Sequence, residues 1–231
     1  MDLLWDGIKE AFRLWIRGDA EIIEITLRTL AVSSLATAVS LLLGVPIGAA
    51  LALKRFPGRR PLVALVNTGM GMPPVVVGLF VAIMLWRSGP FGGLGLIYTP
   101  WAIVIAQFVI AVPLVIGISL AAIQTIDPKL LDQMIALGAN RLQLLWLIVR
   151  EARLGLLAAL MAGFGAVISE VGASIMVGGN IAGETRVLTT ATVLETSRGR
   201  FEVAIALGVM LLVLAYLVNL VFTSAQQRRP A

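Results

Sequence analysis

Five apolar stretches, each long enough to cross a lipid bilayer, constrain this chain more than any other feature of its sequence. They lie at about 26–53, 61–86, 101–123, 154–177 and 203–222, and short polar segments separate them. About 20 predominantly apolar residues in a helix span the hydrocarbon core, where backbone polar groups must bond internally. We therefore expect an all-α integral membrane protein with about five transmembrane helices, in which residues 1–231 form a single domain.

The composition excludes several classes of function. Hydrophobic residues make up 59% of the chain and charged residues 13%, which is too apolar for a soluble globular domain. The chain contains no cysteine and no histidine, so disulfides, thiolate chemistry, histidine metal sites and Ser-His catalysis are ruled out. We expect no catalytic residues and no metal site, and thus a protein that is not an enzyme.

The basic residues predict an orientation in the membrane. The net charge is +5, but the basic residues fall in short loops beside apolar spans, so we expect a lipid membrane and no nucleic acid as the partner. The segment 54–60 carries four positive charges and no acid, which places it in the cytoplasm. The tail at Arg228 and Arg229 follows the same rule, although Arg186, Arg198 and Arg200 fall on the outer side.

The first 21 residues have the pattern of an amphipathic helix. Trp5, Ile8 and Phe12 alternate with charged residues such as Lys9 and Arg13. A helix of this kind, with aromatic side chains on one face, lies in the membrane interface. With the first span running from outside to inside, this helix is expected on the outer side.

Two of the apolar stretches contain residues that are unusual within a membrane. Pro73 and Pro74 remove backbone donors in the second stretch, so the helix is expected to break there, either as a packing kink or as part of a solute pathway. Glu170 is the carboxylate within the fourth stretch, and an acidic residue at a helix centre costs about 2.5–3.5 kcal/mol on insertion scales. Small residues near it, including Gly172 and Ser174, permit close helix packing.

Residues 178–200 are expected to leave the membrane on the outer face. The part from 184 to 196 has the pattern of a short amphipathic surface helix. Its hydroxyls, including Thr189 and Thr190, either solvate that helix or face a passing solute, and we favour solvation.

The segment 127–151 is the longest polar interruption in the second half of the chain. Asp127 has the position of an N-cap and Pro128 that of the first helical residue. Apolar residues then recur at helical spacing on both sides of Gly138, which predicts two short helices that meet at 138–140. On composition alone, a simple interhelical loop would also fit.

Part of this segment resembles a known motif. Asp132-Gln133-Met134, two further residues and Leu137-Gly138-Ala139 are similar to the cytoplasmic coupling loop of ABC-importer permeases, which reads Glu-Ala-Ala, two residues, then Leu-Gly-Ala. The carboxylate and the Leu-Gly-Ala are kept, while the two alanines are not. Arg150 and Glu151 stand where the family usually has Leu-Pro.

The resemblance extends over roughly residues 60–220 and points to a subgroup. The runs at 72–79, 89–92, 170–173 and 178–183 are similar to oxyanion permeases for molybdate, tungstate and sulfate. The continuation at 184–191 looks most like tungstate permeases. Val171 stands where sulfate and molybdate relatives usually carry phenylalanine, which fits the tungstate subgroup.

This resemblance implies a function and a set of partners. The chain would be the permease subunit of an ATP-driven importer in a prokaryotic plasma or inner membrane, and its substrate would be an oxyanion, tungstate or molybdate first. A second copy of itself, two cytoplasmic ATP-binding subunits and an extracytoplasmic oxyanion-binding protein would complete the assembly. No cofactor is expected in this chain, because ATP and Mg²⁺ would bind the partner subunit.

The resemblance also assigns roles to residues. Those expected to couple the permease to the ATPase are Asp132, Ala136, Leu137, Gly138, Ala139 and Arg141. Those expected to line or gate the translocation pathway are Pro73, Pro74, Glu170, Gly172, Ser174 and Asn180. Because a carboxylate repels an anion, a helix-packing hydrogen bond is favoured for Glu170 over contact with substrate. Two alternatives stay open: a permease for sulfate, phosphate or an amino acid, and an ion-coupled secondary transporter that uses Glu170.

Overall fold

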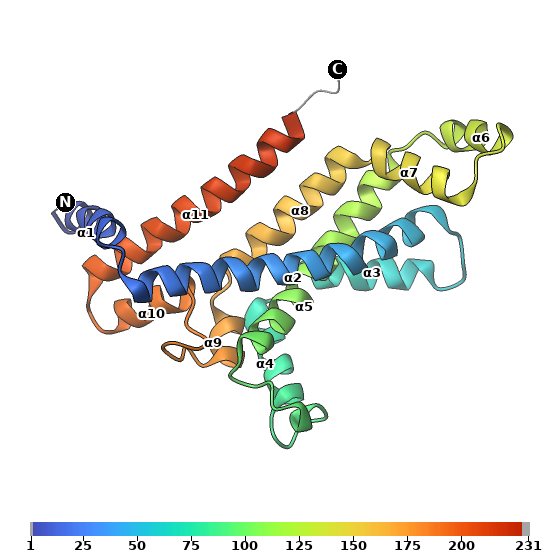
Figure 1. The fold of residues 1–231 in the computed structure, drawn as a ribbon. Helices are drawn as coiled ribbons and strands as arrows, with labels where there is room; N and C mark the ends of the chain where they lie inside the picture. Colours follow the sequence, from blue (N-terminus) through green and yellow to red (C-terminus); the bar gives the residue numbers. More distant parts are fainter. Residues whose placement is uncertain (1, 228–231) are drawn as a thin grey trace.

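A computed structural model describes residues 2–227, and all regular secondary structure in this range is helical, as expected (Figure 1). The helices are α1 Asp2–Arg17, α2 Ala20–Leu53, α3 Arg59–Met70, α4 Pro74–Leu85, the short 3₁₀ helix η1 Gly92–Leu94, α5 Pro100–Gln124, α6 Pro128–Ala136, α7 Arg141–Glu151, α8 Arg153–Ile168, α9 Gly172–Gly178, α10 Leu188–Ser197 and α11 Phe201–Gln227. The predicted basic tail at Arg228 and Arg229 lies outside the described residues.

The number of membrane spans depends on how two bent helix pairs are counted. Three helices, α2, α5 and α11, are long and apolar enough to cross a membrane unbroken. The pair α3 and α4 is bent by 104° and the pair α8 and α9 by 60°, which gives up to five spans within residues 2–227. The predicted break at Pro73 and Pro74 is therefore confirmed. The stretch predicted as the fourth span, 154–177, is a bent pair and not one straight helix, because α8 ends at Ile168 and α9 starts at Gly172.

The helix α2 starts earlier than the predicted span. The side chain of Asp19 caps it, with one carboxylate oxygen accepting from the backbone N–H groups of Glu21 at 3.0 Å and Ile22 at 3.2 Å. The predicted N-terminal helix over 1–21 accordingly ends at Arg17. Its small residues Gly7 and Ala11 are buried, and α1 packs along α11. The sequence did not indicate this packing partner.

The core lies where α2 crosses α5, with α8 packed beside both (Figure 1). Its side chains are small: Ala36 of α2, Ala106 and Val115 of α5 and Ala159 of α8 are fully buried. Small residues let helix backbones approach closely, and close packing rather than a hydrophobic driving force holds helices together within lipid. The remaining helices are arranged around this crossing.

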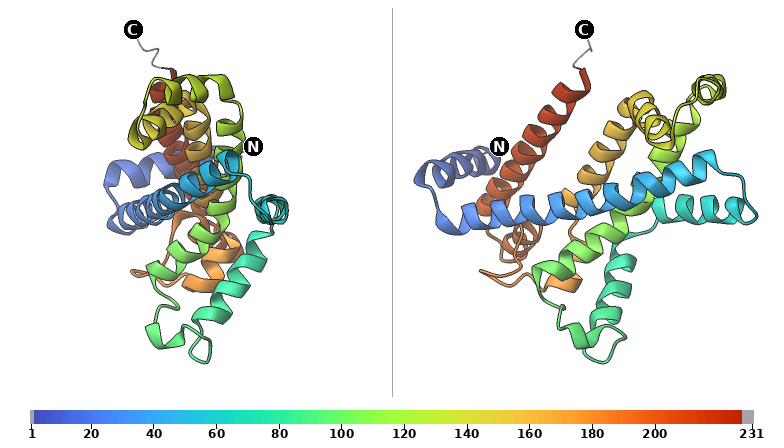
Figure 2. Two further views of the ribbon diagram at one scale, coloured as in Figure 1. Left: turned by 90° about the vertical axis from the view of Figure 1, so that its right-hand side faces the viewer. Right: turned by 45° about the vertical axis from the view of Figure 1, so that its right-hand side comes forward.

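The two ends of α2 contact different parts of the molecule. Near its C-terminal end, Ala49 and Ala52 pack against a cluster that includes Ile148 of α7, so α6 and α7 lie beside the α2–α3 connection (Figure 2). Near its N-terminal end, Ile25 packs with Leu188 of α10 and Leu207 of α11. The basic segment 54–60 and the α6–α7 segment thus share one end of the molecule, as the predicted orientation requires.

The helix α10 is packed more tightly than a surface helix. Thr189 and Thr190 are buried, so the prediction that their hydroxyls are solvated is wrong. The Thr189 hydroxyl donates to the backbone carbonyl of Glu170 at 3.0 Å, and the Thr190 hydroxyl donates to the backbone carbonyl of Val187 at 3.1 Å. The Thr189 bond fastens α10 to the break between α8 and α9, and the Thr190 bond is local to the start of α10.

Candidate functional site

The turn between α6 and α7 is built as the sequence predicts. The Asp127 carboxylate accepts from the backbone N–H of Lys129 at 2.9 Å and caps α6, with Pro128 in its first turn. After α6 the backbone of Gly138 adopts φ +82°, a left-handed conformation that costs other residues about 1–2 kcal/mol. The glycine therefore sets the angle between the two short helices.

A capping box, which the sequence reading missed, begins α7. The Asn140 side chain accepts from the backbone N–H of Gln143 at 2.9 Å, and the Gln143 side chain accepts from the backbone N–H of Asn140 at 2.8 Å. A polar N-cap followed three residues later by glutamine is the sequence signal of this motif. The two bonds make the start of α7 rigid.

The α6–α7 segment is anchored at its base and exposed at its tip. Ile148 is buried with Ile123 of α5, and Leu131 of α6 packs against the same cluster. At the tip, the side chain of Leu137 is 82% exposed and that of Leu142 is 77% exposed. We call the exposed apolar side chains of this segment the tip patch: Ile135, Leu137, Leu142, Leu145 and Trp146. Exposed apolar patches mark sites of contact with a protein, a membrane or a ligand.

The six predicted coupling residues include Leu137 of the tip patch, and the other five lie near it in the sequence, between 132 and 141. Asp132, Ala136, Leu137, Gly138 and Arg141 are exposed, and Ala139 is half-buried. The guanidinium carbon of Arg150 lies 5.1 Å from the centroid of the Trp146 ring. This cation–π contact lies at one edge of the patch. The structure thus brings all six residues together on one exposed turn.

The two helix breaks pack against each other on the other side of the core. A Cβ atom at Gly78 of α4 would lie 2.5 Å from the Cα of Ala173 in α9, and one at Gly172 would lie 2.7 Å from Cγ2 of Val75. Only glycine allows helices to approach this closely. The predicted pathway residues Pro73, Pro74, Glu170 and Gly172 therefore belong to one region.

Glu170 makes a local hydrogen bond and not the predicted bond between helices. Its Oε1 accepts from the backbone N–H of Ala173 at 2.8 Å, and the residue is 8% exposed. The carboxylate therefore acts as a cap for the first turn of α9, where the backbone has broken away from α8. This bond explains why a carboxylate sits at the break.

The other two predicted pathway residues face different neighbours. Ser174 of α9 is 1% exposed, next to the buried Ala173. Asn180 follows α9 with φ +52°, and its side-chain amide donates to the backbone carbonyl of Thr190 at 3.3 Å. Pro73 and Pro74, in contrast, are exposed on the surface of the described chain.

Two polar residues that the sequence reading missed hold this region in place. The buried side-chain amide of Gln107 in α5 donates to the backbone carbonyl of Val167 at 3.1 Å, in the last turn of α8. The Thr185 hydroxyl donates to the carbonyl of Gly178 at 2.5 Å and accepts from the N–H of Ile181 at 2.9 Å. The sequence signal that could have identified Gln107 is its polar amide side chain within an apolar span.

Among residues 2–227, no group of three or more acidic side chains could hold a metal ion.

Comparison with known families identifies the class of protein to which this chain, with its α6–α7 turn and its paired helix breaks, belongs. Residues 44–229 match the family described as the binding-protein-dependent transport system inner membrane component. The chain belongs to this family. It is a membrane permease subunit, and its multiple candidate spans agree with an inner-membrane location.

Relatives cover almost the whole permease. A protein of Haloferax volcanii named as a probable anion ABC transporter permease is 41% identical over 214 residues, which are 90% of this chain and 92% of the relative. The tungstate uptake system permease protein TupB of Peptoclostridium acidaminophilum is 36% identical over 98% of this chain and 100% of its own length. The molybdenum transport system permease protein ModB of Escherichia coli is 31% identical over 75% of this chain and 80% of its own.

Solved structures share the fold of the permease. One chain of the MetNI methionine ABC transporter in an inward-facing conformation superposes with a TM-score of 0.73, at 21% identity and over 90% of this chain and 96% of that one. One chain of a bacterial alginate ABC transporter gives 0.72 at 22% identity, over 96% of this chain and 84% of that one. At these identities the likeness shows the fold, which is that of ABC-importer transmembrane subunits.

Proposed function

We propose that this permease imports tungstate or molybdate, with tungstate as the preferred oxyanion. The observation that carries the proposal is the likeness to a tungstate uptake permease over 98% of this chain and the whole length of that relative. The relative from Haloferax volcanii is named as a probable anion permease and has a higher identity to this chain, so it supports an anion as the substrate. Val171 and the run at 184–191 support tungstate within that class.

The tip patch is proposed to bind a cytoplasmic ATP-binding subunit. Its leucines and Trp146 are exposed, whereas Ile148 at the base of the same segment is buried against α5, so a push on the tip would reach the membrane helices. Two copies of the permease would engage two ATP-binding subunits. ATP and Mg²⁺ would bind those subunits, and this chain would contribute no cofactor site and no catalytic residue.

The solute pathway is proposed to lie between two copies at the paired helix breaks. Pro73 and Pro74 are exposed there, and the neighbouring side chains of Leu79, Phe80 and Ile83 on α4 are exposed and apolar. A second copy would cover this face and complete the pathway. An extracytoplasmic oxyanion-binding protein would deliver the anion at the opposite end from the tip patch, and most of the selectivity would reside in that partner.

Uptake measurements test this function. Vesicles that carry the permease with its ATP-binding subunit and binding protein are loaded with ATP and given radiolabelled tungstate. Unlabelled tungstate, molybdate, sulfate, phosphate and amino acids are the competitors. We expect ATP-dependent uptake that tungstate blocks most strongly and molybdate next. Vesicles without ATP are the control.

The same experiment separates the alternatives. Uptake blocked best by sulfate, phosphate or an amino acid would keep the importer and discard the proposed substrate. Uptake that continues without ATP and collapses with the proton gradient would discard the ATP-driven mechanism in favour of an ion-coupled one.

A further inference from the structure

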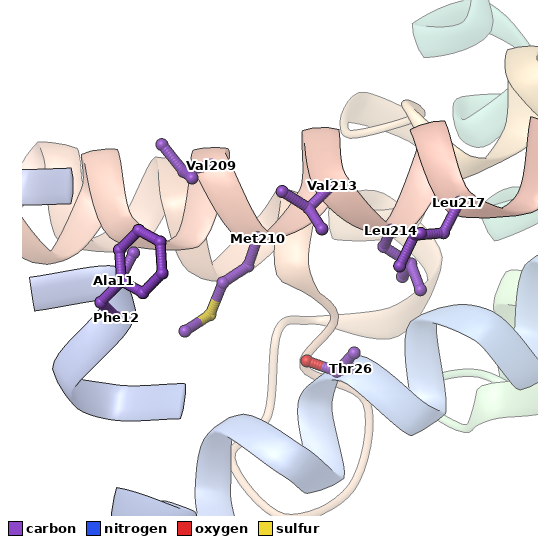
Figure 3. Close-up of a pocket in the computed structure, with 8 residues that line it drawn as sticks. All are labelled: Ala11, Phe12, Thr26, Val209, Met210, Val213, Leu214 and Leu217. Carbon is purple, nitrogen blue, oxygen red and sulfur yellow. The ribbon is translucent and has the colours of Figure 1, made fainter. Parts of the chain in front are cut away.

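An apolar cleft of about 220 Å³ opens between α1, α2 and α11, outside both regions described above (Figure 3). Ala11 and Phe12 line it from α1, Thr26 from α2, and side chains between Val209 and Leu217 from α11. Among the lining residues whose side chains the structure describes, Thr26 alone is polar, and its hydroxyl donates to the carbonyl of Ile22 at 2.8 Å. A cleft with an apolar lining of this kind accepts an apolar ligand.

The position of the cleft indicates where such a ligand comes from. The helix α11 is the least buried of the three unbroken spans, and Leu212 on its surface is 70% exposed. Val213 and Leu217 line the cleft and are also exposed on the outside of α11. The cleft is therefore accessible from the hydrocarbon core of the bilayer, where the available apolar ligand is a lipid acyl chain.

A second hollow lies along α1, and its lining is also mostly apolar, with Ile8 and Ile16 beside two cations. Phe12 lines both, and the second hollow, of about 500 Å³, is also lined by Trp5, Lys9 and Arg13. The ammonium of Lys9 lies 5.8 Å from the centroid of the Trp5 ring. Tryptophan beside exposed cations is the composition of the membrane interface, where lipid phosphates lie.

The two cations of this hollow are available to a phosphate. Lys9 is 3.4 Å from Asp6 and Arg13 is 2.8 Å from Glu10, and their side chains are 58% and 59% exposed. Exposed ion pairs of this kind contribute little to stability, so either cation can turn to an anionic oxygen at small cost. Lys9 and Arg13 lie one turn apart on the helix and point to the same hollow.

We propose that α1, α2 and α11 form a binding site for one phospholipid. An acyl chain fills the apolar cleft, and Lys9 and Arg13 hold the phosphate in the adjoining hollow. The apolar cleft suits an acyl chain, and the two cations beside Phe12 suit the phosphate of the same lipid. The bound lipid would fasten α1 to α11, because Phe12 contacts both of its parts.

Lipid retention by the full chain tests this site, independently of transport. The permease is purified in a mild detergent, and native mass spectrometry measures retained phosphatidylglycerol and phosphatidylethanolamine. We expect one phospholipid per chain. Leu214→Trp fills the cleft and should abolish retention, while Leu212→Trp, on the exposed surface of the same helix, should not.

Replacement of Lys9 and Arg13 together by glutamine separates the two parts of the site. Loss of two cations should weaken phosphatidylglycerol binding about tenfold or more, since each is worth about 1 kcal/mol near an anionic lipid. Inorganic phosphate should not displace the lipid, because it has no chain for the cleft. If Leu214→Trp fails to fold, Val209→Trp fills the same cleft from another position on α11.

Three outcomes would overturn the proposal. Equal retention by Leu214→Trp and Leu212→Trp would mean ordinary annular lipid. Displacement by inorganic phosphate would mean an anion site without a lipid. Disulfide-linked dimers of a Val213→Cys variant in native membranes would mean that a second copy covers the cleft.

Discussion

The guanidinium of Arg28 donates a 2.8 Å hydrogen bond to the carbonyl of Gly183, 155 residues later in the chain. The same group donates to the carbonyl of Arg186 at 3.1 Å and pairs with Glu24, and Arg186 in turn pairs with Glu21 at 2.9 Å. One arginine of α2 therefore holds the segment between α9 and α10. The sequence reading did not single it out.

Replacing Arg28 by methionine should loosen this segment. The side chain is 14% exposed, and hydrogen bonds from a charged group contribute about 1.5–3 kcal/mol, so we expect a loss of stability of that order. Thermal denaturation in detergent and faster amide hydrogen exchange at 183–188 measure it. Arg200→Met is the control, because Arg200 is exposed and 3.4 Å from its partner Glu195. Equal effects of the two changes would contradict the role of Arg28.

Replacing Gly138 by valine should uncouple ATP hydrolysis from uptake. Space around this glycine is open, so the cost is the left-handed backbone alone, about 1–2 kcal/mol, and the angle between α6 and α7 changes to relieve it. Gly199→Val is a matched control, since Gly199 also has a positive φ and open space but lies between α10 and α11. Uptake per ATP hydrolysed should fall for the first variant and not for the second.

Replacing Leu137 by glutamate should release the ATP-binding subunit. The side chain is 82% exposed, so the permease itself should keep its melting temperature. A charge at the centre of an apolar contact surface must be buried without a partner when the complex forms, which costs several kcal/mol. Co-purification of the two subunits measures the effect, and Leu137→Met should retain the complex. Normal co-purification of the glutamate variant would place the contact elsewhere.

Replacing Gly78 by valine should destabilise the pair of helix breaks. The added side chain collides with the backbone of Ala173, and overpacking of this kind costs about 1–3 kcal/mol. Gly165→Ala in α8 is the control, because no heavy atom lies within 4 Å of its added Cβ. Melting temperatures in detergent compare the two, and an unchanged Gly78→Val variant would show that α4 and α9 separate easily.

Replacing Glu170 by glutamine should leave ATP-driven uptake intact. A glutamine oxygen can still accept from the N–H of Ala173, whereas Glu170→Leu removes the cap and should cost about 1 kcal/mol of stability. The glutamine variant carries no ionisable proton. Loss of uptake in Glu170→Gln at an unchanged melting temperature would favour an ion-coupled role for this carboxylate.

Helix ends set by local chemistry were predictable from the sequence. Asp127 with Pro128, Gly138 and the Pro73-Pro74 pair act through their own backbone or their nearest neighbours, and the structure has a cap, a turn or a break at each. The two short helices that carry the tip patch were also predictable, because apolar residues recur at helical spacing on both sides of Gly138.

The break at Glu170 was not predictable in the same way. Apart from Glu170 and two serines, residues 154–177 are apolar, and the partners that hold the ends of α8 and α9 are distant: Gln107 is 60 residues from Val167, and Thr189 is 19 residues from Glu170. The packing of α1 on α11 joins opposite ends of the chain. Tertiary partners decide both features, so periodicity and local propensity carry no signal for them.

The length of α2 has a mechanical consequence. Its 34 residues, about 50 Å at 1.5 Å per residue, reach from Arg28 and its bonded loop to Ala49 and Ala52 beside α7. A helix resists compression along its axis, so a displacement of α7 would reach the opposite end as a movement of the rod as a whole. Pro46 removes one backbone bond near the inner end, so flexing is concentrated there and the longer outer section swings as one piece.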